Sequence, residues 1–476
     1  MVRLADIVVE RRSPDHLGAL VGDERAARFA AMAETTRALL GGRAVLNVSS
    51  TATGGGVAEL LQTLLAYARG VGVDARWFVI DGDPAFFEIT KRIHNHLYGT
   101  PGDGGPLGLP ERRHYERTLR ANGDELAGVV RPGDVVLLHD PQTAALADTV
   151  HRAGGVVVWR SHVGIDTPNA HVEEAWEFLR RYVDGADAFV FSRRAFAPSW
   201  IDPERLHVIA PSIDPFSAKN HEMAPAEAVR VLRYVGLLAG DEHPAPAPFV
   251  RRDGSPGRID RHADILQTGP PPPSDRPLVV QACRWDRLKD MPGVMSGFAE
   301  IVARSSDAHL VLAGPSVSGV ADDPESAVVL DECTAAWRAL PHGQRARVHL
   351  ACTPMRDPDE TAAIVNALQR HASVVVQKSL AEGFGLTVAE AMWKRRPIVA
   401  SGIGGIADQI FDGEHGLLLD DPTDLAAFGK AVLRLLDDPQ LAARLGDNAR
   451  RRAFEEFLPD RHLEQWAALI EAAVSA

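Results

Sequence analysis

Short apolar runs alternate along the chain with amphipathic stretches of about three helical turns. Each run spans four to six residues, which is typical of a strand, and none approaches the roughly 20 residues that a membrane-crossing helix needs. The first half contains Ala44–Val48, Ala75–Ile80, Asp134–Leu138, Gly155–Trp159, Ala188–Phe191 and Leu206–Ile209. The second half contains Leu278–Cys283, His309–Ala313, Val348–Ala351, Ser373–Gln377 and Pro397–Ala400.

The stretches between these runs predict helices, for example over Val57–Gly70 and Thr167–Val183. Strands that are apolar on both faces and alternate with helices form parallel sheets with crossover connections. The pattern therefore predicts an α/β protein with two Rossmann-like, doubly wound parallel-sheet domains facing a cleft. In such sheets ligands bind at the carboxyl ends of the strands.

A proline- and glycine-rich stretch from Pro211 to Pro277 separates the two halves and suits a linker or surface excursion. Its middle, Ala224–Leu238, still predicts a helix. We expect domains at residues 1–213 and 214–455, followed by 456–476. The last segment carries an amphipathic helix, Asp460–Val474, which we expect to pack back across the domains.

The composition of this 476-residue chain limits its expected binding partners and cellular location. A net charge of −13 makes a broad nucleic-acid surface an unfavourable interpretation. The start lacks the apolar core of a secretory signal, and no membrane association is expected. Three cysteines, Cys283, Cys333 and Cys352, show neither paired nor metal-binding spacing, so a reducing cytoplasm is the expected location.

The turn after the first strong strand, NVSSTATGGG, leads directly into a predicted helix. Its three glycines allow a ligand to approach the main chain, and the helix dipole adds partial positive charge. The spacing matches neither the dinucleotide fingerprint nor a P-loop. A flexible strand–helix turn is the alternative interpretation.

Two cations follow the first strand of the second half, in QACRWDRLKD. Arg284 and Lys289 stand where a ligand would lie, and together they could neutralise a diphosphate leaving group, the task of Mg²⁺ elsewhere. The alternative is a solvated turn in which arginine and aspartate pair locally.

The segment EGFGLTVAEAM combines a strand end, a glycine turn and a helix start near Thr387. Glu382 precedes the turn and Glu390 lies inside the helix, so the two carboxylates could bind different parts of one extended ligand. The amides of Leu386 and Thr387 would meet a phosphate between them. The alternative makes Glu382 a turn residue and Glu390 an exposed helix residue.

His162 ends a strand in WRSHVG, where it could donate to a sugar hydroxyl or a phosphate, although an isolated histidine is more often a packed or capping residue. Asp81-Gly82-Asp83 imitates an acidic metal-binding pair but follows a strand as a plain turn, so no metal site is expected there. His94-Asn95-His96 is too short a match for a nuclease.

In this order the four segments resemble the GT-B superfamily of retaining glycosyltransferases, family 4, whose signature is two glutamates separated by seven residues, as in Glu382 and Glu390. Within it the chain resembles trehalose glycosyltransferring synthases. That similarity rests on NVSSTATGGGVAELL, RWFVIDGDPAFFEITKRIHNHLYG, HDPQT, WRSH, PSIDPFSAKN and QACRWDRLKD. It covers most of the chain and thins over residues 240–275.

The resemblance implies a role for each site residue. Arg284 and Lys289 would hold the diphosphate, Glu390 the ribose, and Glu382 the glucose 3-hydroxyl. His162 would contact the glucose 6-hydroxyl or the adjacent phosphate. The remaining donor-binding residues would line the donor by their main chain: Gly55, Gly56, Gly383, Phe384, Gly385, Leu386 and Thr387.

The implied activity joins a nucleotide-activated glucose to glucose, giving trehalose by a front-face, retaining, metal-independent reaction. Residues 1–213 would form the acceptor side and 214–455 would bind the nucleotide sugar, with a hinge near Pro211–Pro215. No cofactor is expected beyond the ADP-, UDP- or GDP-glucose substrate. The partners expected are the nucleotide sugar and the sugar acceptor, and the sequence allows a homodimer.

Three alternatives stay open. A retaining trehalose phosphorylase would use glucose 1-phosphate instead of a nucleotide sugar. A related α-glucosyltransferase would use another acceptor, and residues 163–166 depart from the family pattern beside the expected acceptor pocket. A non-catalytic sugar-nucleotide sensor is disfavoured because every motif residue is present.

Overall fold

The computed structural model describes residues 4–53, 55–240, 245–317 and 325–475. Gly54 of the glycine-rich turn lies outside these residues. Contacts divide the chain into two compact units, one of Met1–Ser212, Glu382–Phe384 and Phe457–Ala476, the other of Ile213–Ala381 and Gly385–Glu456. We call them the first and the second unit. Within the described residues, no helix is long and apolar enough to cross a membrane.

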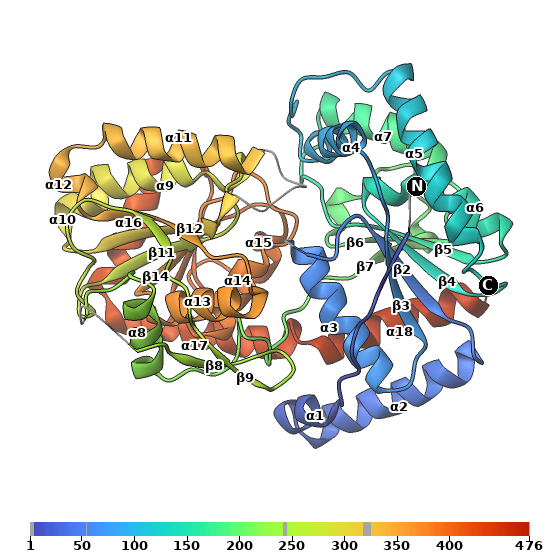
Figure 1. Cartoon of the computed structure of the whole chain (residues 1–476), viewed down its shortest axis with the longest axis horizontal. Helices are drawn as coiled ribbons and strands as arrows, with labels where there is room; N and C mark the ends of the chain where they lie inside the picture. The colour runs from blue at the N-terminus through green and yellow to red at the C-terminus, as the bar shows by residue number, and fades with distance from the viewer. Residues whose placement is uncertain (1–3, 54, 241–244, 318–324, 476) are drawn as a thin grey trace. The chain divides into compact units, whose positions relative to one another are not determined.

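The first unit is built on a seven-stranded sheet in the order β1-β3-β2-β4-β5-β6-β7 (Figure 1). Only β1 runs antiparallel to its neighbour, β3, and the other neighbours pair in parallel. The strands are β1 Ala5–Ile7, β2 Val45–Ser49, β3 Ala75–Val79, β4 Val135–His139, β5 Val156–Ser161, β6 Ala188–Phe191 and β7 Leu206–Val208.

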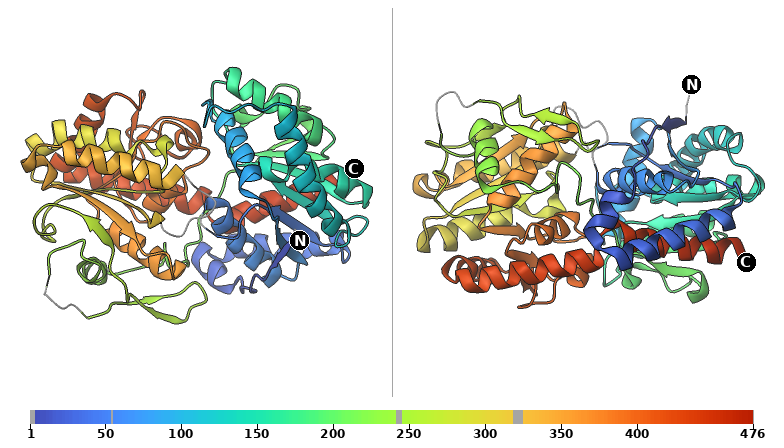
Figure 2. Two further views of the ribbon diagram at one scale, coloured as in Figure 1. Left: turned by 45° about the horizontal axis from the view of Figure 1, so that its top comes forward. Right: turned by 90° about the horizontal axis from the view of Figure 1, so that it is seen from below.

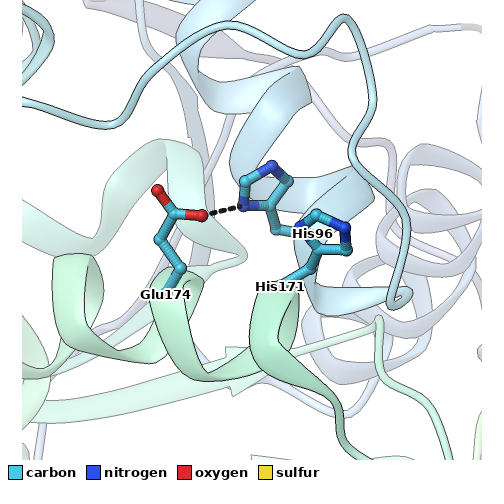
Figure 3. Close-up of side chains that lie close together, drawn as sticks. All are labelled: His96, His171 and Glu174. Carbon is cyan, nitrogen blue, oxygen red and sulfur yellow. Dashed lines mark ion pairs between the residues drawn. The ribbon is translucent and has the colours of Figure 1, made fainter.

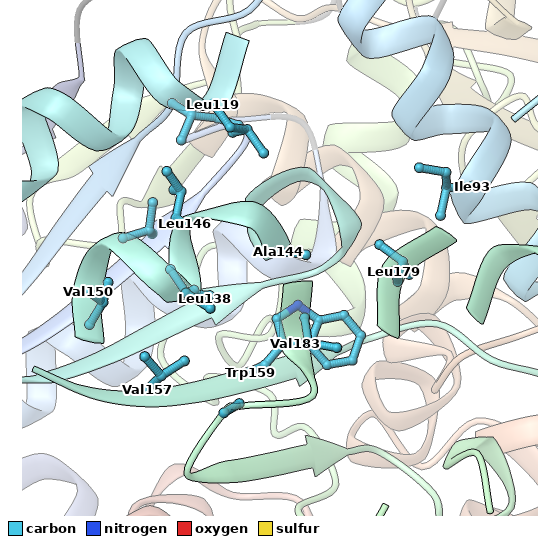
Figure 4. Close-up of a cluster of buried hydrophobic side chains, with 14 of the residues drawn as sticks. Ile93, Leu119, Leu138, Ala144, Leu146, Val150, Val157, Trp159, Leu179 and Val183 are labelled. Atoms are coloured by element: carbon cyan, nitrogen blue, oxygen red, sulfur yellow. The ribbon is translucent and has the colours of Figure 1, made fainter. Parts of the chain in front are cut away.

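Helices cover both faces of this sheet. One face packs against helices whose apolar side chains join a large cluster around the buried Trp159 (Figure 4). On the other face, Trp466 and Ile470 of the C-terminal helix pack with Leu60 and Val135. In Figure 2 this red helix runs beside the blue α2. The helices of the first unit are α1 Asp15–Val21, α2 Asp23–Leu40, α3 Gly56–Gly70, α4 Pro84–Leu97, α5 Leu109–Ala127, α6 Ala147–Arg152, α7 Ala170–Val183 and α18 Pro459–Ser475.

The second unit repeats this plan with the strand order β10-β13-β12-β11-β14-β15-β16. Again the only antiparallel pair in the sheet is at one edge, between β10 and β13. Its strands are β10 Asp264–Leu266, β11 Leu278–Ala282, β12 His309–Pro315, β13 Val348–Thr353, β14 Val374–Gln377, β15 Ile398–Ser401 and β16 Leu417–Leu419. Its helices are α8 Pro225–Tyr234, α9 Met291–Gly297, α10 Ala303–Ser305, α11 Glu325–Ala339, α12 His342–Arg345, α13 Pro358–His371, α14 Leu386–Trp393, α15 Gly404–Gln409, α16 Leu425–Asp437 and α17 Pro439–Glu456.

The predicted class, an α/β protein with two mostly parallel sheets, is confirmed, and every strand predicted from an apolar run is present within one or two residues. The strands β1, β10 and β16 are missing from the prediction. Each has three residues and lacks an apolar run of four to six residues in the sequence, and β1 and β10 are edge strands with little burial.

The proline-rich stretch is more ordered than a linker composition suggests. It contains α8, the hairpin of β8 Pro248–Val250 with β9 Pro256–Arg258, and the edge strand β10. Arginines beside the hairpin pair with the first turn of α13, as in Arg251–Asp357 at 2.6 Å and Arg252–Asp359 at 2.6 Å. These ion pairs attach the hairpin region to the start of α13 within the second unit.

Both sheets reverse their winding direction once. In the first unit the chain passes from β2 to β3 and then to β4, on the opposite side of β2. In the second unit β12 and β14 lie on opposite sides of β11. The helices diverge at such a point and leave room at the carboxyl ends of the strands, where ligands bind in folds of this kind.

Candidate active site

The glycine-rich turn lies at the reversal point of the first sheet, between β2 and α3. Gly55 occupies the N-cap position of α3 and offers no side chain to the first amides of the helix. A Cβ placed on Gly55 would meet nothing within 4 Å, so the described surroundings leave open space here. Gly56, the first residue of α3, is exposed. The turn therefore presents backbone amides to a ligand, as an anion site requires.

His162 follows β5 and belongs to a chain of polar side chains from three neighbouring strands. Its Nε2 lies 3.1 Å from Nδ1 of His139, whose Nε2 lies 3.0 Å from Oδ1 of Asn47. The Nε–H of Arg160 lies 3.4 Å from Nδ1 of His162. The two imidazole rings stack with centroids 5.4 Å apart.

The order of donors and acceptors in this hydrogen-bonded series assigns a tautomer to each of the two histidine rings. The oxygen of Asn47 can only accept, so His139 donates from Nε2 and accepts at Nδ1. His162 then donates from Nε2 and accepts from Arg160 at Nδ1. Burial lowers the pKa of His139 to about 3, with Arg160 adding to the effect, and burial and Arg160 hold the pKa of His162 well below its usual range. Both pKa shifts favour the neutral rings, and His162 must exchange a protein partner to bind a sugar through its ring.

Asp140 fixes the backbone of His162. Its Oδ1 accepts from the His162 N–H at 2.7 Å, and its own N–H donates to the Arg160 carbonyl at 2.8 Å. Asp140 has φ 62° and ψ 179°, a conformation that is nearly confined to glycine and costs on the order of 1–3 kcal/mol. Burial raises the pKa of Asp140 to about 7 against the opposing effects of the His162 N–H and of Arg160. The surrounding hydrogen bonds maintain this strained residue.

In the second unit, Arg284 and Lys289 flank a tight turn at the carboxyl end of β11. Asp286 shapes the turn, because its Oδ1 accepts from the Leu288 N–H at 2.8 Å. The same carboxylate lies 3.8 Å from Arg284, whose side chain is 41% exposed. A local Arg–Asp pair is therefore present, as in the alternative interpretation, but it is long and leaves the guanidinium accessible to an anion.

Hydrogen bonds join this turn to the segment that follows β14. Gln281 donates to the Lys289 carbonyl at 2.7 Å and accepts from the Lys378 N–H at 3.1 Å. The Leu380 N–H donates to the Leu288 carbonyl at 2.7 Å. The buried ammonium of Lys378 pairs with Asp290. The second sheet thus places the Arg284–Lys289 turn beside the residues that lead into α14.

The amino end of α14 begins at a left-handed glycine. Gly385 has φ 88° and ψ 63°, where a side chain would be strained, and it is the N-cap residue of the helix. Leu386 and Thr387 form the first turn, are partly exposed, and direct their amides along the helix axis. A helix start of this kind can bind an anion through its first amides.

Glu382, Gly383 and Phe384 are grouped with the first unit by their contacts. Gly383 lies so close to the His162 carbonyl that an added Cβ would come within 2.2 Å of the oxygen. The ring of Phe384 meets that of Phe457 edge-on at 5.6 Å. Glu382 is 8% exposed, which is unusual for a turn carboxylate.

Glu390 is buried, so the alternative that makes it an exposed helix residue is wrong. Its carboxylate lies 3.4 Å from the ammonium of Lys219, and the residue is 4% exposed. Lys394 is also buried nearby. Burial lowers its pKa to about 7, although the charge of Glu390 opposes this shift. A ribose bound by Glu390 would share the carboxylate with Lys219.

The prediction from sequence missed the residues that support these groups. In the first unit they are Asn47, His139, Asp140 and Arg160, and in the second Lys219, Gln281, Asp290 and Lys378. The segments that carry the family resemblance contain Asn47, His139, Asp140, Arg160, Lys219, Gln281 and Asp290, and each lies within two residues of the carboxyl end of a strand or in a connecting loop. Position at a strand end was the available signal. It cannot reveal which strands are neighbours.

Asp81 and Asp83, whose spacing resembles an acidic metal-binding pair, take part in local hydrogen bonds. Asp83 caps α4 by accepting from the Phe86 N–H at 2.8 Å and also contacts His114 at 2.8 Å. Asp81 interacts through its backbone with the Asn122 side chain. The pair therefore behaves as the plain turn that the sequence predicts.

Comparison with known proteins adds to this geometry. The family model "Trehalose synthase, N-terminal domain" matches residues 47–198, and "Glycosyl transferases group 1" matches residues 265–452. The chain is 32% identical to a trehalose synthase of Thermococcus litoralis, covering 95% of both chains, and 33% identical to one of Rubrobacter xylanophilus, covering 89% of both. A trehalose phosphorylase of Pleurotus pulmonarius is 26% identical, with 86% of this chain covering 54% of the relative.

Solved structures share the fold. A trehalose-phosphate synthase from Burkholderia xenovorans superposes with a TM-score of 0.66 at 15% identity, covering 90% of this chain and all of that one. A sucrose-phosphate synthase from Thermosynechococcus elongatus gives 0.59 at 17% identity, covering 90% and 96%. The fold and the matched models define an enzyme class, the GT-B glycosyltransferases of group 1. Within that class the chain belongs to the trehalose synthase family.

Proposed function

We propose that the protein transfers glucose from a nucleoside diphosphate glucose to glucose and so forms trehalose with retention at the donor carbon. The observation that carries this proposal is the hydrogen-bonded pair of segments at the reversal point of the second sheet. They supply two cations, Arg284 and Lys289, and the amino end of α14. The names of the relatives support trehalose as the product.

The donor would lie along the second unit with its diphosphate between these groups. Cleavage of the anomeric C–O bond places negative charge on the diphosphate and positive charge on the glucosyl ring. Fixed cations and helix amides stabilise the first charge without a metal ion and without reorganisation. Glu382 would bind the glucosyl ring and Glu390 the ribose.

The acceptor would lie on the first unit, near the turn of Gly55 and Gly56 and near His162. In a front-face reaction the acceptor hydroxyl attacks from the side of the leaving group. Its proton passes to the departing phosphate oxygen as the new C–O bond forms and the old one breaks, so the free nucleoside diphosphate is released. A hinge near Pro211–Pro215 would let the two units close and exclude water.

The test is a product assay in which ADP-, UDP- and GDP-glucose are each supplied with glucose, glucose 6-phosphate and fructose after treatment with a chelator. The proposal expects trehalose and a nucleoside diphosphate in equal amounts with at least one donor. Trehalose formation only when Mg²⁺ or Mn²⁺ is restored would overturn metal independence. A product from another acceptor alone would replace the proposed acceptor.

Because trehalose phosphorylases are among the relatives, a second experiment distinguishes phosphorylase activity from the proposed transferase activity. Trehalose is incubated with inorganic phosphate and, in a parallel reaction, with a nucleoside diphosphate. Release of glucose 1-phosphate in the first would identify a phosphorylase, whereas nucleotide glucose in the second is the result the proposal expects. Turnover in either reaction excludes a non-catalytic sensor.

A further inference from the structure

Two helices of the first unit bring a second set of polar groups together, apart from the glycine-rich turn and the His162 chain. His96 stands in the last turn of α4, and His171 and Glu174 stand in the first turns of α7 (Figure 3). A ligand atom from each residue lies within 4.8 Å of the others. His171 and Glu174 are three residues apart, so they project from the same helix face.

The distances suit a small cation after a modest adjustment. Nδ1 of His96 lies 3.5 Å from Oε2 of Glu174, close to the separation of about 3.3 Å between two ligands around tetrahedral zinc. The rings of His96 and His171 have centroids 5.0 Å apart at 49°. His171 is half-buried and Glu174 is exposed, so both side chains have room to rotate toward His96.

The His96 ring forms a hydrogen bond with the backbone of Pro101, but its Nδ1, which faces Glu174, lacks one among the described residues. The residue is 3% exposed, and Nδ1 is buried. Where Nδ1 of His96 is unprotonated, its lone pair faces the Glu174 carboxylate at 3.5 Å. A cation bound between the two groups would be attracted by both.

Hydrogen bonds through the Asn169 side chain and the Gly99 backbone already link the end of α4 to the start of α7. Asn169 accepts from the His171 N–H at 3.1 Å and donates to the Gly99 carbonyl at 2.8 Å. The Gly99 N–H in turn donates to the His96 carbonyl at 2.8 Å. The backbone that carries two of the ligands is thus preorganised, as a metal site needs.

We propose that His96, His171 and Glu174 form a zinc site, with water completing a tetrahedral arrangement. Two imidazoles and one carboxylate suit Zn²⁺, whereas Mg²⁺ prefers an all-oxygen shell. The ion ties the end of α4 to the start of α7, directly after the loop that carries His162. Its role is structural, and it stands apart from the metal-free transfer proposed above.

The experiment measures Zn²⁺ binding to the chelator-treated full chain by isothermal titration calorimetry and metal analysis. The expected result is one equivalent per chain with a dissociation constant below about 1 μM and a midpoint of thermal unfolding several degrees higher with Zn²⁺ than with chelator. Co²⁺ in place of Zn²⁺ should give the visible absorption of a tetrahedral site.

Two variants assign the binding to these residues. His171→Ala and Glu174→Gln should each weaken Zn²⁺ binding at least tenfold and remove the thermal shift, while their unfolding midpoints with chelator stay near that of the unchanged protein. His151→Ala is the control, since His151 lies on the same unit and pairs with Asp187 at 3.0 Å. Binding unchanged in the first two variants, equal binding of Mg²⁺, or no stoichiometric binding would each overturn the proposal.

Discussion

Arg284 and Lys289 are cations at the carboxyl edge of the second sheet. Hydrogen bonds from neighbouring side chains hold the turn that contains them. Gln281 holds the Lys289 carbonyl, and Asp286 holds the Leu288 N–H. In the first unit, Asn47, His139 and Arg160 similarly set the orientation of the His162 ring. At the residue scale the supporting side chains are mostly buried, whereas Arg284 is 41% exposed at its side chain.

Replacing either cation of the turn should slow transfer more than it weakens folding. Arg284→Ala and Lys289→Ala are each expected to lower kcat at least 100-fold, because each removes a fixed positive charge from the leaving diphosphate. Arg287→Ala is the matched control, because Arg287 lies in the same turn but pairs with Glu325 at 2.9 Å and Glu332 at 2.6 Å. Near-normal rates in the first two variants would contradict the assigned role.

The raised pKa of Asp140 predicts a pH-dependent cost to folding. Because the folded protein keeps the Asp140 proton up to about pH 7, whereas an unfolded aspartate loses it near pH 4, stability falls as pH rises across this range and is level above it. Asp140→Asn should remove that fall, which amounts to a few kcal/mol. Urea-unfolding midpoints of the two proteins from pH 4 to pH 8 give the measurement. A difference between the proteins that does not vary with pH would show that Asp140 titrates normally.

At the element scale the decisive feature is the start of α14. A left-handed Gly385 ends the turn that follows β14, and the first turn of the helix is partly exposed. The turn and the helix could both be read from the sequence, because glycine and a change of apolar period mark them. The hydrogen bonds between this segment and the turn after β11 could not be read, because β11 and β14 are nearly 100 residues apart in the chain.

Gly385→Ala should affect both stability and donor binding. A Cβ in the left-handed region costs about 1–2 kcal/mol and turns the amides of Leu386 and Thr387. We expect a lower unfolding midpoint and a raised KM for the nucleotide sugar. Gly413→Ala, at an exposed glycine with φ 71° and open surroundings, should lower the midpoint without changing KM. Equal kinetic effects in both variants would remove the special role of Gly385.

At the scale of the whole molecule, each unit has its own sheet and its own apolar core. The C-terminal helix α18 belongs to the first unit although it follows the second along the chain. Asp460 at its start pairs with Arg25 at 2.7 Å, and Trp466 lies under the Arg160 guanidinium at 5.2 Å. The end of the sequence thus helps to support the residues around His162.

Trp466→Ala should therefore destabilise the first unit selectively. Removing this buried ring costs about 3–5 kcal/mol and should speed amide exchange in β2 and β4. Exchange in β11 and β12 should stay unchanged. Trp337→Ala, in the core of the second unit, should give the reverse pattern. Faster exchange in both sheets from either variant would show that the two cores unfold together.

The sequence by itself determined the repeated α/β plan, eleven strands of the two sheets and the segments that carry the candidate chemistry, because periodicity, glycine turns and strand ends are local signals. Only the tertiary structure decided which strand ends are neighbours. That ordering joined His139 and Asn47 to His162, buried Glu390 beside Lys219, and brought His96 to His171 and Glu174. The physical reason is that strand order and helix packing follow from the burial of apolar faces across the whole unit, which no short stretch of sequence contains.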